Sequence, residues 1–167
     1  MAQLTYSYAT PVAVAGGIAD ISDYVIESRA NEASDGALYY GMGVVVGTTA
    51  GKTVALPSAS TDAFEGVVVN GFTTEQSMAG VVTIPNKATV GCMTHGKIWV
   101  RVAKSQTVTY NSTAYLYYSG TGAIGCFGAS SSNGIPVGTF KSAVTTTTAY
   151  DLALVELGYD KDTVPSG

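Results

Sequence analysis

The feature that most constrains the fold of this chain is a succession of short β-type runs that begins near Ala37. Runs of Val, Ile, Thr and Tyr alternate with Gly, Asn, Ser and Pro at the spacing of about 8–12 residues that is typical of a β-sandwich or barrel. No segment with helical periodicity and the length of a helix interrupts them. The sequence therefore predicts an all-β protein, an antiparallel β-barrel or β-sandwich of about 8–10 short strands with an extended N-terminal arm. The expected strands are residues 39–47, 52–56, 65–72, 80–84, 88–93, 97–103, 114–118, 123–127, 136–141 and 149–157.

Residues 64–72 are expected to form the strand around which the others are arranged. They contain three consecutive valines, which are stiff at χ1 and suit a pleated surface. A continuous apolar run bounded by glycines indicates a strand that is covered on both faces. Gly66 and Gly71 would allow the sheet to bend at both ends of the run.

The chain divides into an arm (residues 1–35), a β-barrel or sandwich domain (36–157) and a C-terminal tail (158–167). The start of the arm alternates only loosely and contains no turn that would fold it back as a hairpin. It is expected to be extended. Residues 18–29 could instead form one or two helical turns, because Ile18, Ile21 and Val25 would share one face. The residues leave both interpretations open.

Composition and charge exclude several kinds of partner. Charged residues make up 12% of the chain, about half of the roughly 25% found in an average domain. The net charge is −4 and no stretch clusters Lys or Arg, so a nucleic-acid partner is not expected. The first residues lack the basic region of a signal peptide, and the early apolar run 11–19 is too short to span a bilayer. We therefore expect synthesis in the cytoplasm and no membrane partner.

No arrangement of side chains indicates catalysis, a cofactor or a metal site. Cys92 and Cys126 lie in strand-like surroundings and are expected to be buried reduced thiols, with a disulfide as the alternative. His95 is the only histidine and no Cys-x-x-Cys spacing is present, so a zinc site is not expected. The carboxylates of residues 20–27 lack the glycine turn and the glutamate of a calcium loop.

Two regions carry residues suited to contacts with other molecules or segments. Along residues 97–102, Ile98, Val100 and Val102 should share one face, so Trp99 and Arg101 should point the other way. Outward Trp and Arg suit a binding interface, although the ring could equally cover a second layer of the fold. Arg29 could bind a carboxylate or backbone carbonyls where the arm joins the domain, or it could be exposed and balance a nearby glutamate.

The order of several short motifs resembles the structural cement proteins of tailed phages, which decorate the capsid. No single motif is specific, and their order and spacing carry the resemblance. They are residues 15–20, 26–29, 41–47, 54–57 and 64–69, followed by the turn 84–85, the strand 98–102 and the end strand 151–157.

This resemblance implies a non-enzymatic protein that binds the outer surface of the expanded phage head, bridges neighbouring major capsid subunits and forms a homotrimer. The arm would then reach the shell or a neighbouring subunit. A second hypothesis, suggested by the tyrosines and the polar loops, is a fibre- or adhesin-like module that binds carbohydrate or a cell surface. The residues expected to contact the capsid or another subunit are Pro11, Val14, Ile18, Asp20, Ile21, Tyr24, Arg29, Trp99 and Arg101.

Overall fold

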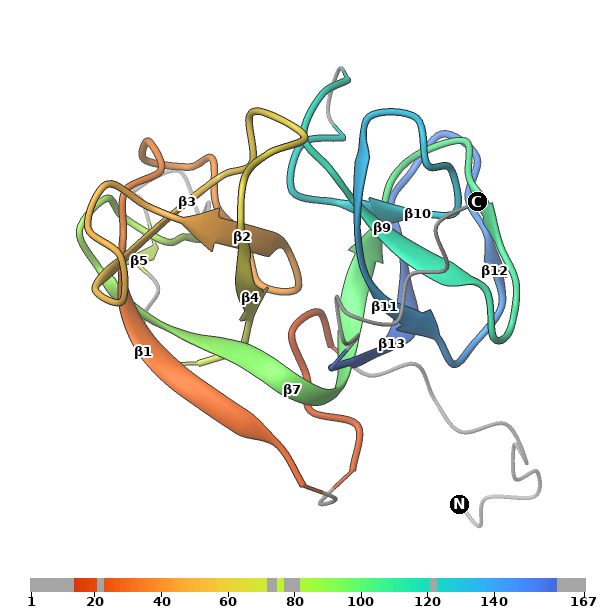
Figure 1. Ribbon diagram of the computed structural model, residues 1–167, viewed down its shortest axis with the longest axis horizontal. Coiled ribbons are helices and arrows are strands. Elements are labelled where there is room, and N and C mark those ends of the chain that lie inside the picture. Colours follow the sequence, from red (N-terminus) through yellow and green to blue (C-terminus); the bar gives the residue numbers. More distant parts are fainter. Residues whose placement is uncertain (1–13, 21–22, 72–74, 77–81, 121–122, 159–167) are drawn as a thin grey trace, which may run out of the picture.

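A computed structural model of the chain describes residues 14–20, 23–71, 75–76, 82–120 and 123–158 (Figure 1). These residues form thirteen strands and no helix, so none of the described segments is a helix able to cross a membrane. The strands are β1 (Val25–Asn31), β2 (Gly43–Val46), β3 (Thr53–Ala55), β4 (Phe64–Val68), β5 (Glu75–Gln76), β6 (Val82–Thr83), β7 (Thr89–Val102), β8 (Thr107–Val108), β9 (Thr113–Tyr117), β10 (Phe127–Gly128), β11 (Gly134–Phe140), β12 (Val144–Thr145) and β13 (Asp151–Leu157).

The main sheet closes into two five-stranded rings that share β7. Its nine strands follow the order β1-β3-β2-β4-β7-β10-β9-β11-β13, and further pairings join β1 to β7 and β7 to β13. The two rings are the two lobes of Figure 1, with β7 running from one to the other. The expected all-β class is confirmed. Two pairings, β1 with β3 and β10 with β7, are parallel rather than antiparallel. The pairs β5–β6 and β8–β12 form two small separate sheets.

β7 is the strand on which both lobes are built. Its first half pairs with β1 and β4, and its second half pairs with β13. The change of lobe occurs near Gly96, whose φ of 117° is readily adopted only by glycine. The sequence predicted two strands, 88–93 and 97–103, because it did not reveal that residues 94–96 continue the ladder. β7 thus takes the central place that the sequence assigned to residues 64–72.

The described residues form two main hydrophobic cores and a smaller third cluster of Ala103, Tyr117 and Cys126, and β4 and β7 contribute to both main cores. Within β4, Val67 belongs to the larger core and Val68 to the core of the β1–β4 lobe. In β7, Met93 and Cys92 are divided in the same way. The expectation that the valine run is covered on both faces is therefore confirmed, although β4 ends at Val68. Further along β7, the expected inward face of Ile98, Val100 and Val102 is fully buried.

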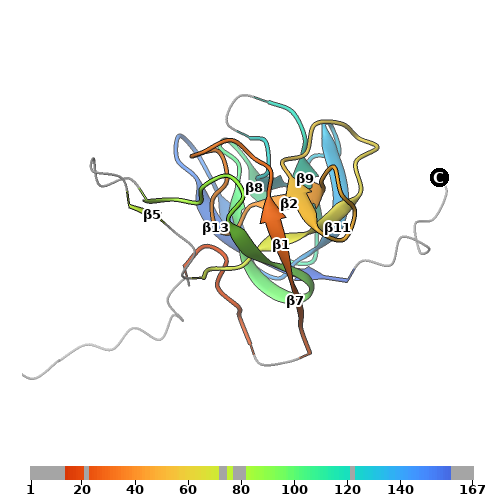
Figure 2. The ribbon, with the colours of Figure 1, turned by 90° about the vertical axis from the view of Figure 1, so that its left-hand side faces the viewer.

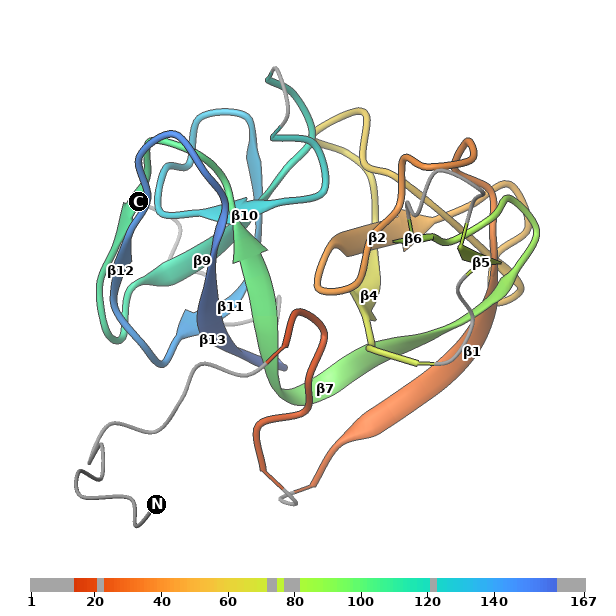
Figure 3. The ribbon, with the colours of Figure 1, turned by 180° about the vertical axis from the view of Figure 1, so that it is seen from behind.

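The helical alternative for residues 18–29 is wrong, because β1 begins at Val25. β1 lies within the segment expected as an arm and runs antiparallel to β7, from Val25 opposite His95 to Ala30 opposite Thr89. β-branched residues at its start suit a strand better than a helix. Residues 14–20 also lie against β7, between the two lobes (Figure 3).

Candidate functional site

The start of β1 projects from the body of the molecule and carries apolar side chains that the fold does not bury. Figures 1 and 2 show the segment that leads into β1 at the bottom of both views. Tyr24 and Val25 are each 47% exposed and Ile26 is 38% exposed. Because adjacent residues of a strand point to opposite faces, Val25 and Ile26 show that both faces are open here. Uncovered apolar residues of this kind commonly mark an interaction site.

The same part of β1 has one free backbone edge. One edge of β1 pairs with β7 along Val25 to Ala30. The other edge pairs with β3 only at Ala30 and Asn31. Among the described residues, no strand lies along that edge from Val25 to Arg29. A free edge can accept a strand from another chain through backbone hydrogen bonds.

Residues 14–20 add to this exposed apolar segment. The Gly16 amide donates to the Trp99 carbonyl (2.8 Å), and the Trp99 amide donates to the Gly17 carbonyl (3.0 Å). These bonds hold Val14, which is 62% exposed, and Ile18, which is 38% exposed, close to β7. We call Val14, Ile18, Tyr24, Val25 and Ile26 together the β1 surface.

Arg29 joins β1 to β4 inside the β1–β4 lobe. Its Nε donates to Glu65 Oε1 (2.6 Å), Nη1 donates to the Ser28 carbonyl (3.1 Å), and Nη2 pairs with Glu27. The Arg29 side chain is only 13% exposed. The Glu65 hydrogen bond is the main cause that raises the pKa of Arg29 above its usual value. Arg29 thus binds a carboxylate at the junction of the two strands, and it also balances Glu27.

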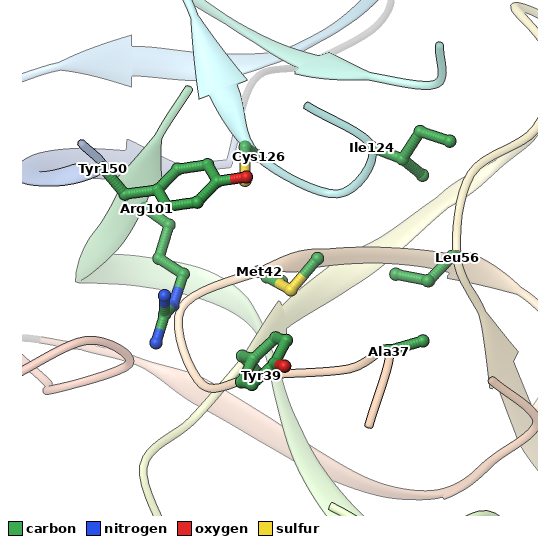
Figure 4. A pocket seen from close by; sticks show the side chains of 8 residues that line it. All are labelled: Ala37, Tyr39, Met42, Leu56, Arg101, Ile124, Cys126 and Tyr150. Atoms are coloured by element: carbon green, nitrogen blue, oxygen red, sulfur yellow. The ribbon is translucent and has the colours of Figure 1, made fainter. Parts of the chain in front are cut away.

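Trp99 and Arg101 lie on the outward face of β7 but contact different parts of the molecule. Trp99 is half-buried beside the segment 14–20. The Arg101 Nε donates to the Tyr40 carbonyl (3.0 Å), and its guanidinium carbon lies 5.1 Å from the centre of the Tyr39 ring. Arg101 also lines a cleft of about 600 Å³ between the two lobes (Figure 4).

The structure brings together some of the sequence-predicted contact residues and separates others. Val14, Ile18, Asp20 and Tyr24 lie along the segment that leads into β1, and Asp20 pairs with Lys97 of β7 (3.2 Å). Arg29 is engaged within its lobe, and Arg101 belongs to the cleft. Pro11 and Ile21 lie outside the described residues. Sequence reasoning missed Val25, Ile26, Tyr39 and Tyr150, which are exposed; the adjacent apolar pair Val25-Ile26 could have signalled a strand with both faces open.

The described residues offer no obvious catalytic chemistry. Both cysteines are buried and free. Burial is the main cause that raises the pKa of Cys92 to about 12 and that of Cys126 to about 11, so both are protonated at neutral pH. Within the described ranges, no three His, Cys, Asp or Glu side chains gather as a metal site would require. A thiolate nucleophile or bound metal therefore has no support in this part of the chain.

Comparison with known proteins identifies the family. The family model described as structural cement protein (E217 gp24/Pam3 gp6) matches residues 2–158. The chain belongs to this family. It is therefore a structural protein of the phage virion that stabilises the capsid and binds capsid proteins, as the resemblance of its motifs indicated.

A solved structure confirms the fold of this cement protein. A chain from the capsid of Myoviridae phage XM1 superposes with a TM-score of 0.68 and 15% sequence identity, covering 92% of this chain and 95% of that one. At this identity the likeness shows the shared fold. No curated protein sequence matches the chain significantly.

Proposed function

We propose that the cement protein binds the outer surface of the expanded head through its β1 surface and bridges neighbouring major capsid subunits. The observation that carries this proposal is the projecting start of β1, where Tyr24, Val25 and Ile26 are exposed beside a free strand edge. Neither of the two main hydrophobic cores includes these side chains. Their exposure supports a contact between this segment and a partner.

The free edge of β1 suits the addition of a strand from a capsid subunit. Backbone hydrogen bonds would supply affinity, and the apolar side chains on both faces would supply specificity. The segment 14–20 would extend the contact, because it is held beside β7 by backbone bonds. Contacts with two neighbouring subunits would resist their separation when the packed genome presses on the shell.

The mechanism requires binding and no turnover. A protein that binds only the assembled lattice stabilises that lattice in proportion to its occupancy. A homotrimer would engage three equivalent positions at once and so gain avidity from modest individual contacts. Low charge also limits the cost of removing water from the contact surface. The proposed cement protein is accordingly a non-enzymatic structural component.

Sedimentation with purified heads tests this proposal. The purified protein is mixed with expanded heads that lack the cement protein and, as a control, with unexpanded heads of the same phage. Bound copies per shell are counted on quantitative gels. We expect saturable binding to expanded heads at a ratio set by the lattice symmetry. Equal binding to unexpanded heads would contradict selectivity for the expanded lattice, and absence of binding to either would contradict the proposed attachment.

A further inference from the structure

The cleft between the lobes has the dimensions and layered lining of a small-molecule site. Its volume of about 600 Å³ lies within the roughly 300–1,000 Å³ typical of such sites. Met42 and Cys126 are buried, at 6% and 3% exposure, and form the buried part of the lining. Tyr39, Ile124 and Tyr150 are between 37% and 40% exposed and form the rim.

The two sides of the cleft differ in chemistry. Figure 4 shows Tyr150, Arg101 and Tyr39 following one another along one side, opposite Ile124, Leu56 and Ala37. One side is therefore aromatic and cationic, whereas the other is aliphatic. Both lobes contribute, since Tyr39 and Leu56 come from the segments around β2 and β3, while Arg101 comes from the second half of β7.

Arg101 is positioned to bind an anion. Its Nε is fixed by the Tyr40 carbonyl and its charge lies against the Tyr39 ring. Within the described part of the chain, its terminal nitrogens make no hydrogen bond or ion pair. These nitrogens can present a planar fork that matches a carboxylate. Fixing Nε in advance reduces the entropy lost when a ligand binds.

The electrostatic setting favours an anion as well. Among the described residues, those that line the cleft include no Asp or Glu. Just beyond it, the Lys104 ammonium lies 5.0 Å from the centre of the Tyr150 ring. Arg101 is thus the charged residue of the described lining, with Lys104 near the Tyr150 ring and Asp151 next to Tyr150 in the chain.

We propose that the cleft binds a small organic carboxylate with an apolar or aromatic body. The carboxylate accepts hydrogen bonds from the terminal nitrogens of Arg101, and the body lies between Tyr39 or Tyr150 and the aliphatic side near Ile124. Because both lobes contact the ligand, binding also stabilises their relative arrangement. This site is separate from the β1 surface and does not depend on capsid binding.

Titration with 4-phenylbutyrate tests the proposal, with 4-phenylbutan-1-ol and 4-phenylbutylamine as probes of the same shape without the anion. Binding is measured by calorimetry and by the fluorescence of Trp99, the only tryptophan, which shares the outward face of β7 with Arg101. We expect the carboxylate to bind at least ten-fold more tightly than either control. Equal binding of the alcohol, or no binding of the carboxylate, would overturn the proposal.

Matched variants locate the binding. Arg101→Met should weaken 4-phenylbutyrate binding at least ten-fold, whereas Lys141→Met removes a charge outside the cleft and should leave it unchanged. Tyr39→Leu should weaken binding several-fold, and Tyr110→Leu, at a 68% exposed position away from the cleft lining, should not. Thermal unfolding curves establish that each variant is folded. If Arg101→Met does not fold, the site is tested by comparing Tyr39→Leu with Tyr110→Leu and by comparing the three probes on the unaltered protein.

A peptide probe separates a small-molecule site from a protein docking site. The dipeptide acetyl-Tyr-Asp-amide carries its carboxylate on the aspartate side chain of a short peptide. Binding of this peptide in the absence of any binding by 4-phenylbutyrate would identify the cleft as a protein docking site and overturn the small-molecule proposal. Unchanged 4-phenylbutyrate affinity in folded Arg101→Met would likewise overturn it.

Discussion

Arg29 of β1 reaches Glu65 of β4, with its Nε 2.6 Å from Oε1 and both side chains less than 15% exposed. β1 and β4 are both paired with the first half of β7. The ion pair therefore links two strands that both pair with β7. We propose that this contact positions the β1 surface; direct contact between Arg29 and the capsid stays a prediction.

Removal of either partner of the Arg29–Glu65 pair should lower thermal stability, and the effects of the two substitutions should not be additive. We expect Arg29→Met to lower the Tm by roughly 2–4 °C, because Glu65 then loses its partner in a partly buried position. Lys141→Met, which breaks the more exposed pair with Glu156 (2.9 Å), should have a smaller effect. Thermal unfolding of Arg29→Met, Glu65→Gln and the double variant measures the coupling. Strictly additive losses would show that the pair contributes no interaction energy.

Gly96 should be far less tolerant of substitution than another glycine with positive φ. A Cβ at Gly96 would lie 2.8 Å from Tyr24 Cβ, whereas a Cβ at Gly51 meets nothing within 4 Å. We expect Gly96→Ala to cost about 2–4 kcal/mol from strain and crowding. Gly51→Ala, at φ +75°, should cost about 1 kcal/mol from strain alone. Denaturant unfolding measures the stability of the two variants. Equal losses would contradict a special role for Gly96, where β7 passes from one lobe to the other.

Acid should destabilise the fold partly through Glu32. Hydrogen bonds from the Thr48 hydroxyl, and then from the Thr48 amide (2.9 Å), lower the pKa of Glu32 below its ordinary value of 4.5. A lowered folded-state pKa gives stability that is present above 4.5 and is lost as the pH falls through the folded value. Glu32→Gln should therefore be less stable at neutral pH and should lose less stability on acidification. Parallel curves of stability against pH for the two proteins would exclude this contribution.

The two thiols should react slowly in the folded protein. Burial raises the pKa of Cys126 from 9.0 to about 11, which lowers its thiolate fraction at neutral pH about a hundredfold. Cys92, with a pKa of about 12, should react more slowly still. Mass spectrometry after iodoacetamide treatment at pH 7.5 measures this, with urea-unfolded protein as the control. Rapid stoichiometric labelling of either cysteine in the folded protein would instead indicate an activated thiol.

The sequence predicts local patterns well because they depend on neighbouring residues. The alternation of Ile98, Val100 and Val102 and the two-sided burial of the valine run follow from strand periodicity and composition. The sharing of β7 by two rings could not be predicted, since it depends on long-range pairing and on Gly96 continuing a strand. Glycine is more often a sign that a strand ends.

The functional surfaces, like the strand pairing, could be predicted only where they depend on residues close together in the sequence. Carboxylate binding was one of several roles that the sequence left open for Arg29, because its partner Glu65 lies 36 positions away and no pattern connects the two. The β1 surface was partly anticipated through Val14, Ile18 and Tyr24. The cleft was not, because Tyr39, Arg101 and Tyr150 come together only when the two lobes are assembled.

The most direct test of the account is head binding by a variant of the β1 surface. Val25→Asp combined with Ile26→Asp places two charges on exposed positions outside the hydrophobic cores. Tyr110→Asp, which adds one charge at an exposed position elsewhere, is the control. Each protein is sedimented with expanded heads at a concentration that half-saturates the unaltered protein. We predict at least a ten-fold loss of bound copies for the double variant and none for the control. Unchanged binding by a folded double variant would contradict attachment through the β1 surface.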